Sequence, residues 1–413
     1  MSLIFNEPLK HRPKSRVELH VHLDGAIRHE TLWEVMRQKG LSLPGNGSLS
    51  DLKEALKVQE PRDLAHFLQA FAIFLPAVVG DAALMERMAY EFLEDQAREC
   101  VAYCEVRFCP HLLLPSHNLT PSEQETQLNG SVNGAKEMVV EDVMDAVLKG
   151  LARGEQQFGT KARVILCCFW GQSEWSWDIL RLCEEYKERG VVGIDLAGVE
   201  GLGSESESFT KSAVECAVFE AAKEKGIHRT IHAGEEGPAS GVQKAVEMFG
   251  AERIGHGYHV LEDEEVYKMC QQENIHFEMC PHSSFLTGSV KSLTTPSKRH
   301  PILRFAEDEV SFSINTDDPT LTHTRLSDEY KLLISWGLTE AHLTRANFQA
   351  ALHSFLPPKE KKQLIDQLKE AYGFIHYSLP PILCSTSTSP SETRTSTPPP
   401  KPSVTFGTWA DRS

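Results

Sequence analysis

The chain has 413 residues, of which 41% are hydrophobic and 24% are charged, a composition typical of a folded globular protein. The net charge of −16 argues against nucleic acid as a partner, because an acidic chain repels a phosphate backbone. The length is compatible with one large α/β barrel or with two smaller domains.

The N-terminal segment and the cysteines bear on the cellular compartment. The first 16 residues are polar, and no apolar run reaches the roughly 18 residues of a membrane span, so we expect neither a signal peptide nor a membrane span. The 10 cysteines contain no C-x-x-C pair, and several lie in apolar runs, as Cys167 and Cys168 do. This spacing is typical of reduced, buried thiols. We therefore expect a cytoplasmic protein.

Short apolar segments rich in β-branched residues recur along the chain and predict strands buried on both faces. Amphipathic segments of helical length follow almost every one, for example at residues 173–190, 208–226 and 263–275. This alternation predicts a parallel sheet, and eight repeats favour a closed (β/α)₈ barrel over a doubly wound open sheet. The eight predicted strands span residues 17–21, 103–108, 163–169, 191–197, 229–233, 253–258, 275–280 and 310–315.

Other segments depart from this alternation. Residues 29–100, after the first strand, contain no predicted strand, and we expect this helical insert to cover the mouth of the barrel. Residues 120–136 are polar and predict a long surface loop. Residues 385–413 are rich in Ser, Thr and Pro and predict a disordered tail. We therefore expect a single catalytic domain over residues 1–384, with helices at its C-terminal end.

Ionisable residues gather at the C-terminal ends of the predicted strands, which meet on one face of a barrel, where active sites lie. Each motif alone also has an ordinary interpretation, such as polar strand residues, a structural histidine or a turn. The combination favours a catalytic site. Its residues are His20 and His22 in the first strand, His232 and Glu235 at the fifth, His256 in the sixth, and Asp317 and Asp318 after the eighth.

Three imidazoles and one carboxylate are a ligand set typical of zinc. His20 and His22 are two residues apart in a strand and therefore point to the same side, so with His232 and Asp317 we expect them to bind one Zn²⁺ per chain. Zinc lowers the pKa of a bound water to about 7. Glu235 would then act as general acid and base, and His256 would orient the hydroxide.

The motifs VELHVHLDGAIRHETL, DLAG, HRTIHAGE, RIGHGYH and SINTDDP occur in this order and resemble those of the adenosine deaminases of the amidohydrolase superfamily. The resemblance runs from Val17 to Tyr372. It implies a (β/α)₈ barrel with one divalent ion. It also implies zinc-dependent hydrolysis of adenosine and 2′-deoxyadenosine to inosine and 2′-deoxyinosine with release of ammonia, in purine nucleoside catabolism and salvage.

The same resemblance implies roles for individual residues. In catalysis, Glu235 would protonate N1 of the purine, His256 would position the hydroxide, and Asp317 would complete the metal site. The remaining residues would contact substrate. They are Asp318 at N7, the backbone N–H of Gly198 at N3, Asp24 at the ribose hydroxyls, His22 near the 5′ position, and Phe67 and Phe71 as an apolar gate. For the two phenylalanines, packing in the core of a helix is an equally good interpretation.

Asp24 favours a nucleoside over a nucleotide, because its charge would repel a 5′-phosphate. Relatives that act on adenine tend to carry Glu at this position, and those that act on N6-methyl-AMP tend to carry Asn. Two residues depart from the family pattern. Cys109 replaces Ser, and Val199 replaces an acidic residue beside Gly198, which is expected to alter the pocket or its loop.

Three alternatives compete with this interpretation. An amidohydrolase for another base or nucleotide would share the motifs. A barrel that only binds nucleoside or a partner protein would not need Glu235, and a two-metal hydrolase would need a bridging Lys that the predicted strands lack. We expect a monomer that binds a small purine nucleoside, and a location at the cell surface through a partner protein is an alternative to the cytoplasm alone.

Overall fold

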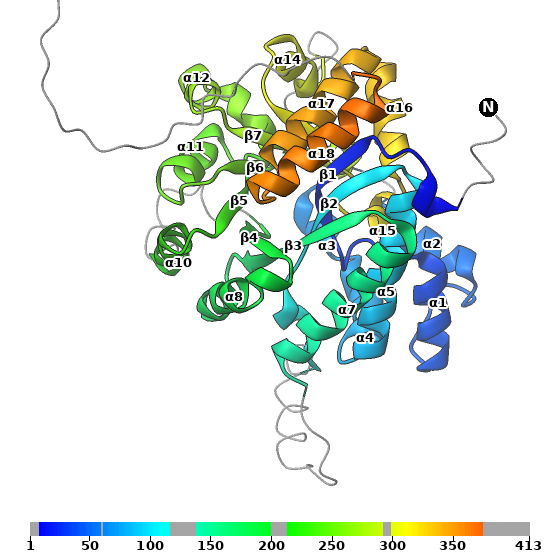
Figure 1. Cartoon of the computed structure of the whole chain (residues 1–413). Helices are drawn as coiled ribbons and strands as arrows, with labels where there is room; N and C mark the ends of the chain where they lie inside the picture. Colours follow the sequence, from blue (N-terminus) through cyan, green and yellow to red (C-terminus); the bar gives the residue numbers. More distant parts are fainter. Residues whose placement is uncertain (1–7, 59–60, 116–137, 200–212, 292–298, 375–413) are drawn as a thin grey trace, which may run out of the picture. The chain divides into compact units, whose positions relative to one another are not determined.

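The computed structural model describes residues 8–58, 61–115, 138–199, 213–291 and 299–374. Eight parallel strands follow one another around a sheet in sequence order (Figure 1). An isolated bridge between Val21 and Asp317 links the two ends of this sheet. The strands are β1 (Arg16–His22), β2 (Val101–Phe108), β3 (Lys161–Phe169), β4 (Val191–Ala197), β5 (His228–Ala233), β6 (Arg253–His256), β7 (His276–Met279) and β8 (Phe312–Ile314).

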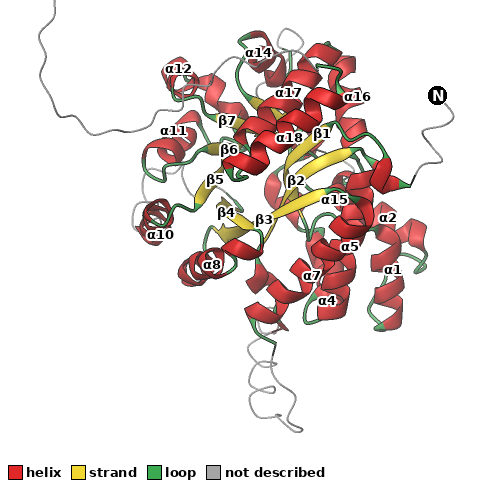
Figure 2. Cartoon of the chain, in the orientation of Figure 1, coloured by secondary structure: helices red, strands yellow, loops and turns green. Residues whose placement is uncertain are grey.

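Helices surround the strands and cover the outer face of the barrel (Figure 2), while side chains of the strands fill its interior. The first five are α1 (His29–Gln38), α2 (Leu49–Leu56), α3 (Leu64–Leu68), α4 (Phe71–Val78) and α5 (Ala82–Arg98). Those between the later strands are α7 (Val140–Phe158), α8 (Ser173–Glu185), α10 (Ala213–Glu224), α11 (Ala239–Glu247), α12 (Glu264–Gln272), α13 (Pro281–Leu286) and α14 (Pro301–Glu307). The chain closes with α15 (Pro319–Thr322), α16 (Leu326–Trp336), α17 (Glu340–His353) and α18 (Pro358–Ala371). Short 3₁₀ turns are η2 (Leu9–His11), η3 (Pro110–Leu113), η5 (Lys187–Arg189) and η6 (Tyr258–Glu262).

The predicted (β/α)₈ barrel is confirmed, and each of the eight apolar segments contains a strand. Three strands end earlier than predicted, β6 by two residues and β7 and β8 by one residue each. His256 and Gly257 have φ angles of 62° and 74°, so β6 cannot continue to residue 258. β8 is only three residues long. Asn315, which follows it, still donates its backbone N–H to Met279 O of β7, and its side chain accepts from the N–H of Leu19.

The insert after β1 is helical as predicted, but only part of it covers the pocket. Side chains of α3 and α4 line the cavity beside the histidines, whereas α5 packs along α7 on the outside of the barrel. The predicted loop at residues 120–136 and the predicted tail at residues 385–413 lie outside the described residues. Among the described helices, none has both the length and the hydropathy of a membrane span.

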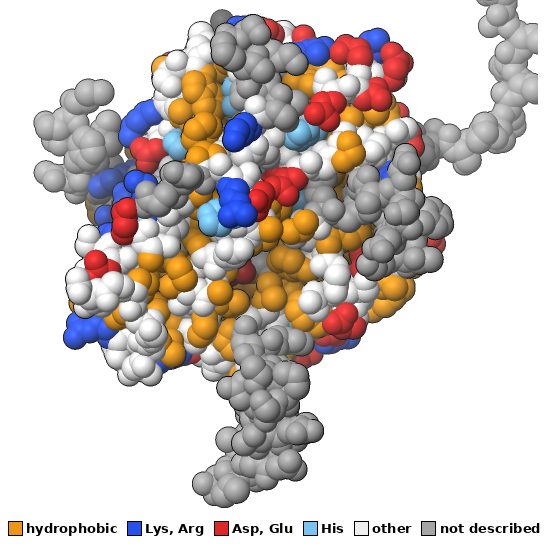
Figure 3. Space-filling view, turned by 180° about the vertical axis from the view of Figure 1, so that it is seen from behind, with side chains coloured by type: hydrophobic (Ala, Val, Ile, Leu, Met, Phe, Trp, Pro, Cys, Tyr) orange, Lys and Arg blue, Asp and Glu red, His pale blue; other side chains and the backbone are white. Residues whose placement is uncertain are grey.

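The surface carries charges of both signs. On the face drawn in Figure 3, acidic and basic side chains of the described residues are interspersed with apolar ones. Many of them form ion pairs between neighbouring elements. Arg181 of α8, for example, contacts both Glu141 of α7 and Glu185 of its own helix. Exposed pairs of this kind contribute little to stability, so the fold depends on its buried contacts.

The close contact between α5 and α7 yields a test of the packing. A methyl group on Gly150 of α7 would lie 2.2 Å from the carbonyl oxygen of Glu86. We expect Gly150→Ala to lower the free energy of unfolding by roughly 1–3 kcal/mol, the usual cost of overpacking. Urea unfolding measures this, with Gln156→Ala on the exposed face of the same helix as control. An unchanged midpoint for Gly150→Ala would contradict the contact.

Candidate active site

Four predicted metal ligands lie together at the C-terminal end of the barrel. One ligand atom from each of His20, His22, His232 and Asp317 lies within 4.8 Å of the others. The Nε2 atoms of His20 and His22 are 3.2 and 3.4 Å from Oδ1 of Asp317. The Nε2 atoms of His22 and His232 are 3.3 Å apart. Because these side chains come from β1, β5 and the turn after β8, barrel closure assembles the cluster.

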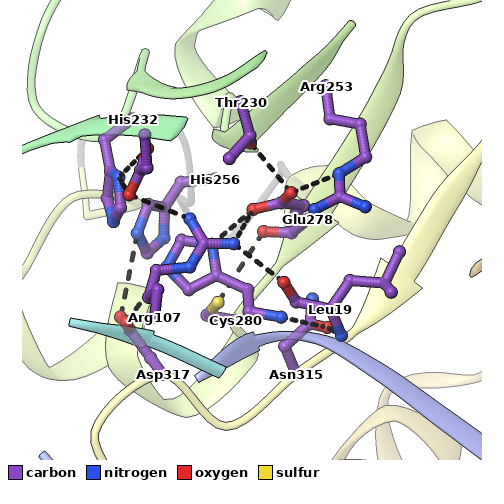
Figure 4. Close-up of polar contacts among 12 residues, drawn as sticks. Leu19, Arg107, Thr230, His232, Arg253, His256, Glu278, Cys280, Asn315 and Asp317 are labelled. Atoms are coloured by element: carbon purple, nitrogen blue, oxygen red, sulfur yellow. Dashed lines mark hydrogen bonds and ion pairs between the residues drawn. The ribbon is translucent and has the colours of Figure 1, made fainter. Parts of the chain in front are cut away.

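Two buried carboxylates set the tautomers of these histidines, and one of them, Glu278, is labelled in Figure 4. Nδ1 of His20 lies 2.7 Å from Glu278 of β7, and Nδ1 of His232 lies 3.1 Å from Asp195 of β4. A carboxylate holds the proton on Nδ1, which leaves the Nε2 lone pair available to a metal. Nε2 of His20 is buried and has no hydrogen-bond partner. The donor set therefore fits a zinc ion, which accepts imidazole nitrogen and carboxylate oxygen.

A layer of buried ion pairs lies beneath the histidines. Arg107 of β2 contacts Asp195 at 3.1 Å and Glu278 at 2.6 Å, and Arg253 of β6 contacts Glu278 at 2.7 Å. Burial would raise the pKa of Glu278, but the two guanidinium groups hold it well below its usual range. For Asp195, burial is likewise outweighed by His232 and Arg107, and its pKa is lowered. Both carboxylates are thus ionised and able to orient the histidines.

Sequence reasoning missed this layer. The available signal was a charged residue inside an apolar strand segment, as at Arg107 in β2, Asp195 in β4 and Glu278 in β7. A charged side chain in a strand buried on both faces needs a buried partner. The partners lie on other strands, however, so the sequence indicates that a network exists and not which residues pair.

A second group, His20, His256, Cys280 and Asp317, has ligand atoms equally close together. Burial raises the pKa of the Cys280 thiol well above its ordinary value, and its Sγ lies 3.7 Å from the carbonyl oxygen of Glu278. The two groups share His20 and Asp317. In the group with His22 and His232, buried carboxylates orient two of the three imidazoles, those of His20 and His232, and this group is the predicted ligand set.

The predicted acid–base residues border the metal ligands. Nε2 of His256 lies 3.6 Å from Glu235 and 3.7 Å from Asp317. Burial lowers the pKa of His256 well below its ordinary value, so the ring is neutral at neutral pH. His256 and Asp317 have φ angles of 62° and 64°, which are costly for residues other than glycine. Such strain collects at functional sites, where surrounding contacts hold it in place.

An apolar cavity of about 150 Å³ opens beside these residues. Asp24 and Asp318 line it, and each has a buried Oδ1 without a hydrogen-bond partner. Burial raises the pKa of Asp24 to about 6. Burial, together with the charges of Asp317 and Asp24, raises the pKa of Asp318 well above its ordinary value, so its carboxyl can donate a hydrogen bond. An apolar cavity with a few convergent polar groups is typical of a small-molecule site.

The cavity walls contain part of the predicted contact set. Gly198, at a φ of 92°, lies in the wall, as does Phe71. Phe67 does not line the cavity: it is 1% exposed and packs in the core, which is the second of the two interpretations that the sequence left open for it. α3 turns a different face toward the cavity. The apolar lining comprises Leu64 and Leu68 of α3, Phe71 and Leu75 of α4, and Leu112, Phe169 and Ala197 from strand ends.

Two further observations concern the surroundings of the cavity. Val199 is 52% exposed and is not among the residues that line the cavity. Larger cavities of about 320 and 410 Å³ lie elsewhere, beside Gln96 of α5 and beside Arg163 of β3. Neither contains the histidine cluster, so the smaller cavity is the candidate active site.

Comparison with known proteins assigns a family to this arrangement. Residues 13–371 match the family model described as adenosine deaminase. The adenosine deaminases of Danio rerio and Bos taurus are 45% and 43% identical over 361 residues, which is 87% of this chain and 96% and 95% of theirs. The solved structure of the N6-methyl-AMP deaminase from Arabidopsis thaliana is 25% identical, with a TM-score of 0.68 over 88% of this chain and 98% of that one.

Asp195 offers a test of the orienting layer. Asp195→Asn removes the charge that holds the proton on Nδ1 of His232. We expect zinc affinity to fall by roughly 10–100-fold, as is usual when the partner of a ligating histidine is lost. Competition with a chromogenic chelator measures the affinity. Cys167→Ala is the control, because its Sγ also contacts Asp195, at 3.5 Å, and is not a ligand. Wild-type affinity in Asp195→Asn would contradict the role.

Proposed function

The chain belongs to the adenosine deaminase family, and we propose that it hydrolyses adenosine and 2′-deoxyadenosine to inosine and 2′-deoxyinosine with release of ammonia. The proposal rests on one observation: the cluster of the four predicted metal ligands meets Glu235 and His256 at one apolar cavity. We propose one Zn²⁺ per chain, bound by His20, His22, His232 and Asp317. Zinc in this site would make a water molecule nucleophilic at neutral pH.

The reaction requires acid catalysis because attack at C6 breaks the aromaticity of the purine. The displaced electron pair moves to N1, where Glu235 donates a proton. His256, which burial keeps neutral, accepts a hydrogen bond from the attacking oxygen and directs it toward C6. The two protons of the consumed water end on N1 and on the departing ammonia. The tetrahedral carbon then becomes the carbonyl carbon of inosine.

The remaining residues would bind and orient the nucleoside. We propose that the carboxyl of Asp318 donates to N7 and that the backbone N–H of Gly198 donates to N3. Asp24 would bind the ribose hydroxyls, with His22 near the 5′ position, and Phe71 would cover the base. The raised pKa of Asp318 supports the first contact, because purine N7 is an acceptor and a protonated carboxyl is a donor.

A nucleotide deaminase is the second candidate, because the N6-methyl-AMP deaminase of Arabidopsis thaliana shares this fold. Asp24 supports the nucleoside. Asp24 is 6% exposed, lines the cavity, and has one carboxyl oxygen without a hydrogen-bond partner. The 5′-phosphate of a nucleotide would lie close to the Asp24 carboxylate, and the two negative charges would repel each other.

We also propose a cytoplasmic monomer. Nine cysteines of the described residues are free thiols, and most of them are buried. Free thiols persist in a reducing compartment, which supports the cytoplasm. Binding of a partner protein at the cell surface would involve the exposed surface of the protein and not the residues that take part in the reaction.

The reaction itself is tested by the fall in absorbance as adenosine becomes inosine. Wild-type protein with measured zinc content should turn over adenosine, and Glu235→Gln should retain zinc but lose roughly 10²–10⁴-fold in kcat, the usual contribution of a positioned acid. Glu236→Gln is the matched control, since Glu236 is the exposed neighbouring residue. The proposal fails if zinc-loaded protein leaves adenosine unchanged, or if both variants behave alike.

Substrate choice is tested with adenosine, 2′-deoxyadenosine, adenine, AMP and N6-methyl-AMP. We expect the wild-type protein to prefer the two nucleosides. In Asp24→Asn the ratio of kcat/KM for AMP to that for adenosine should rise at least tenfold, which corresponds to about 1.4 kcal/mol. Equal use of AMP and adenosine by the wild-type protein would instead support the nucleotide deaminase.

A further inference from the structure

The barrel closes between β8 and β1 through side chains more than through a backbone ladder. In the described chain, the backbone contacts of this seam are His22 N–H to Asp317 O at 2.8 Å and Asp317 N–H to His20 O at 3.2 Å. The other N–H groups of β1 that face this side donate to asparagine side chains. Val17 donates to Asn347 at 2.9 Å, and Leu19 donates to Asn315 at 2.8 Å.

Asn315 accepts two consecutive N–H groups, because His20 also donates to its Oδ1, at 3.1 Å. Two successive N–H groups directed at one oxygen mark a β-bulge. The pairing of β1 with β2 shows the same irregularity: Glu18 pairs with Cys104 and Val21 with Val106, so β1 has one extra residue. The bulge therefore lies at the residue that contributes the first metal ligand.

The bulge changes which way the side chains point. In a regular strand Glu18 and His20, two residues apart, would share a face. Here Glu18 bonds to Gln96 of α5, outside the barrel, whereas His20 bonds to Glu278 inside it. Arg107 also donates to the carbonyl oxygen of Leu19, at 2.8 Å, so both polar groups of the bulge are satisfied.

The carboxamide of Asn315 is held in one orientation (Figure 4). Its Nδ2 donates to Met279 O at 3.0 Å and to Ser313 Oγ at 3.1 Å, and the residue is fully buried. With both amide hydrogens engaged on β7 and β8, the oxygen faces β1. The next residue is held too, since Thr316 donates its N–H to Glu18 at 2.8 Å. Asn315 thus holds the backbone of His20 through its side chain, and in the chain it lies two residues before Asp317.

We propose that Asn315 is a positioning residue for the metal site: its carboxamide sets the bulge in β1 that turns His20 toward Asp317. Nε2 of His20 and Oδ1 of Asp317 lie 3.2 Å apart across this seam. The inference rests on the proposed zinc site, because its effect is on metal binding. Asn347 of α17 accepts from the N–H of Val17, at the end of β1 away from the ligands, and we expect it to serve only the fold.

The pair of asparagines provides a matched experiment. Asn315→Ala and Asn347→Ala each remove a buried carboxamide that accepts from β1. We expect similar losses of unfolding free energy in urea. Starting from the zinc-loaded protein, competition with a chelator should show a roughly 10–100-fold loss of zinc affinity in Asn315→Ala only. The cobalt-substituted Asn315→Ala protein should have an altered visible spectrum, and Asn347→Ala should match the wild type.

Wild-type zinc affinity and cobalt spectrum in Asn315→Ala would overturn the proposal, as would an equal loss of zinc affinity in Asn347→Ala. If Asn315→Ala does not fold, Asn315→Asp replaces it. This variant keeps the accepting oxygen and loses the donors to Met279 and Ser313, so zinc affinity should still fall, and a wild-type value would overturn the proposal. These readouts need no substrate, so they remain valid if the wild-type protein fails to deaminate adenosine.

Discussion

The structure depends on a pair of buried arginines at the centre of the barrel. Arg107 and Arg253 are surrounded by the carboxylates of Glu105, Asp195 and Glu278, all out of contact with solvent. Burying such charges costs several kcal/mol per ion unless each is paired and hydrogen-bonded. Asp317, which contacts His20, adds a fourth carboxylate next to this layer. A divalent cation in the proposed zinc site would offset negative charge there, which would link metal binding to the stability of the core.

The strained backbone near the histidines follows from the same arrangement. His256 and Asp317 occupy the left-handed region in which glycine is favoured, yet the chemistry requires their side chains. The turn at Asp317 is held by hydrogen bonds of its backbone to both His20 and His22. Gly255 precedes His256 because a methyl group there would lie 2.9 Å from the His20 ring. Close approach of β6 to β1 thus restricts which residue can precede the strained histidine.

Much of the fold and of the metal ligand set could be predicted from the sequence, because apolar strand segments and the ionisable residues that end them are local patterns. What could not be predicted depends on contacts between distant segments. The sequence left Phe67 open between a gate and core packing, because the face of a five-residue helix that meets the cavity depends on packing; Leu64 and Leu68 occupy that face. The role of Asn315 depends on a bulge in another strand, which no local pattern of the residues 313–317 indicates.

The seam between β1 and β8 also has a consequence for the synthesis of the chain. Leu19 and Asn315 are separated by 296 positions, and Val17 and Asn347 by 330. A ribosome adds roughly 5–20 residues per second, so β1 is synthesised long before Asn315 and Asn347 are. In the proposed zinc site, the first two histidines would be without Asp317 throughout that time. Closure of the site around an ion would then require the last part of the polypeptide, which a prematurely terminated chain lacks.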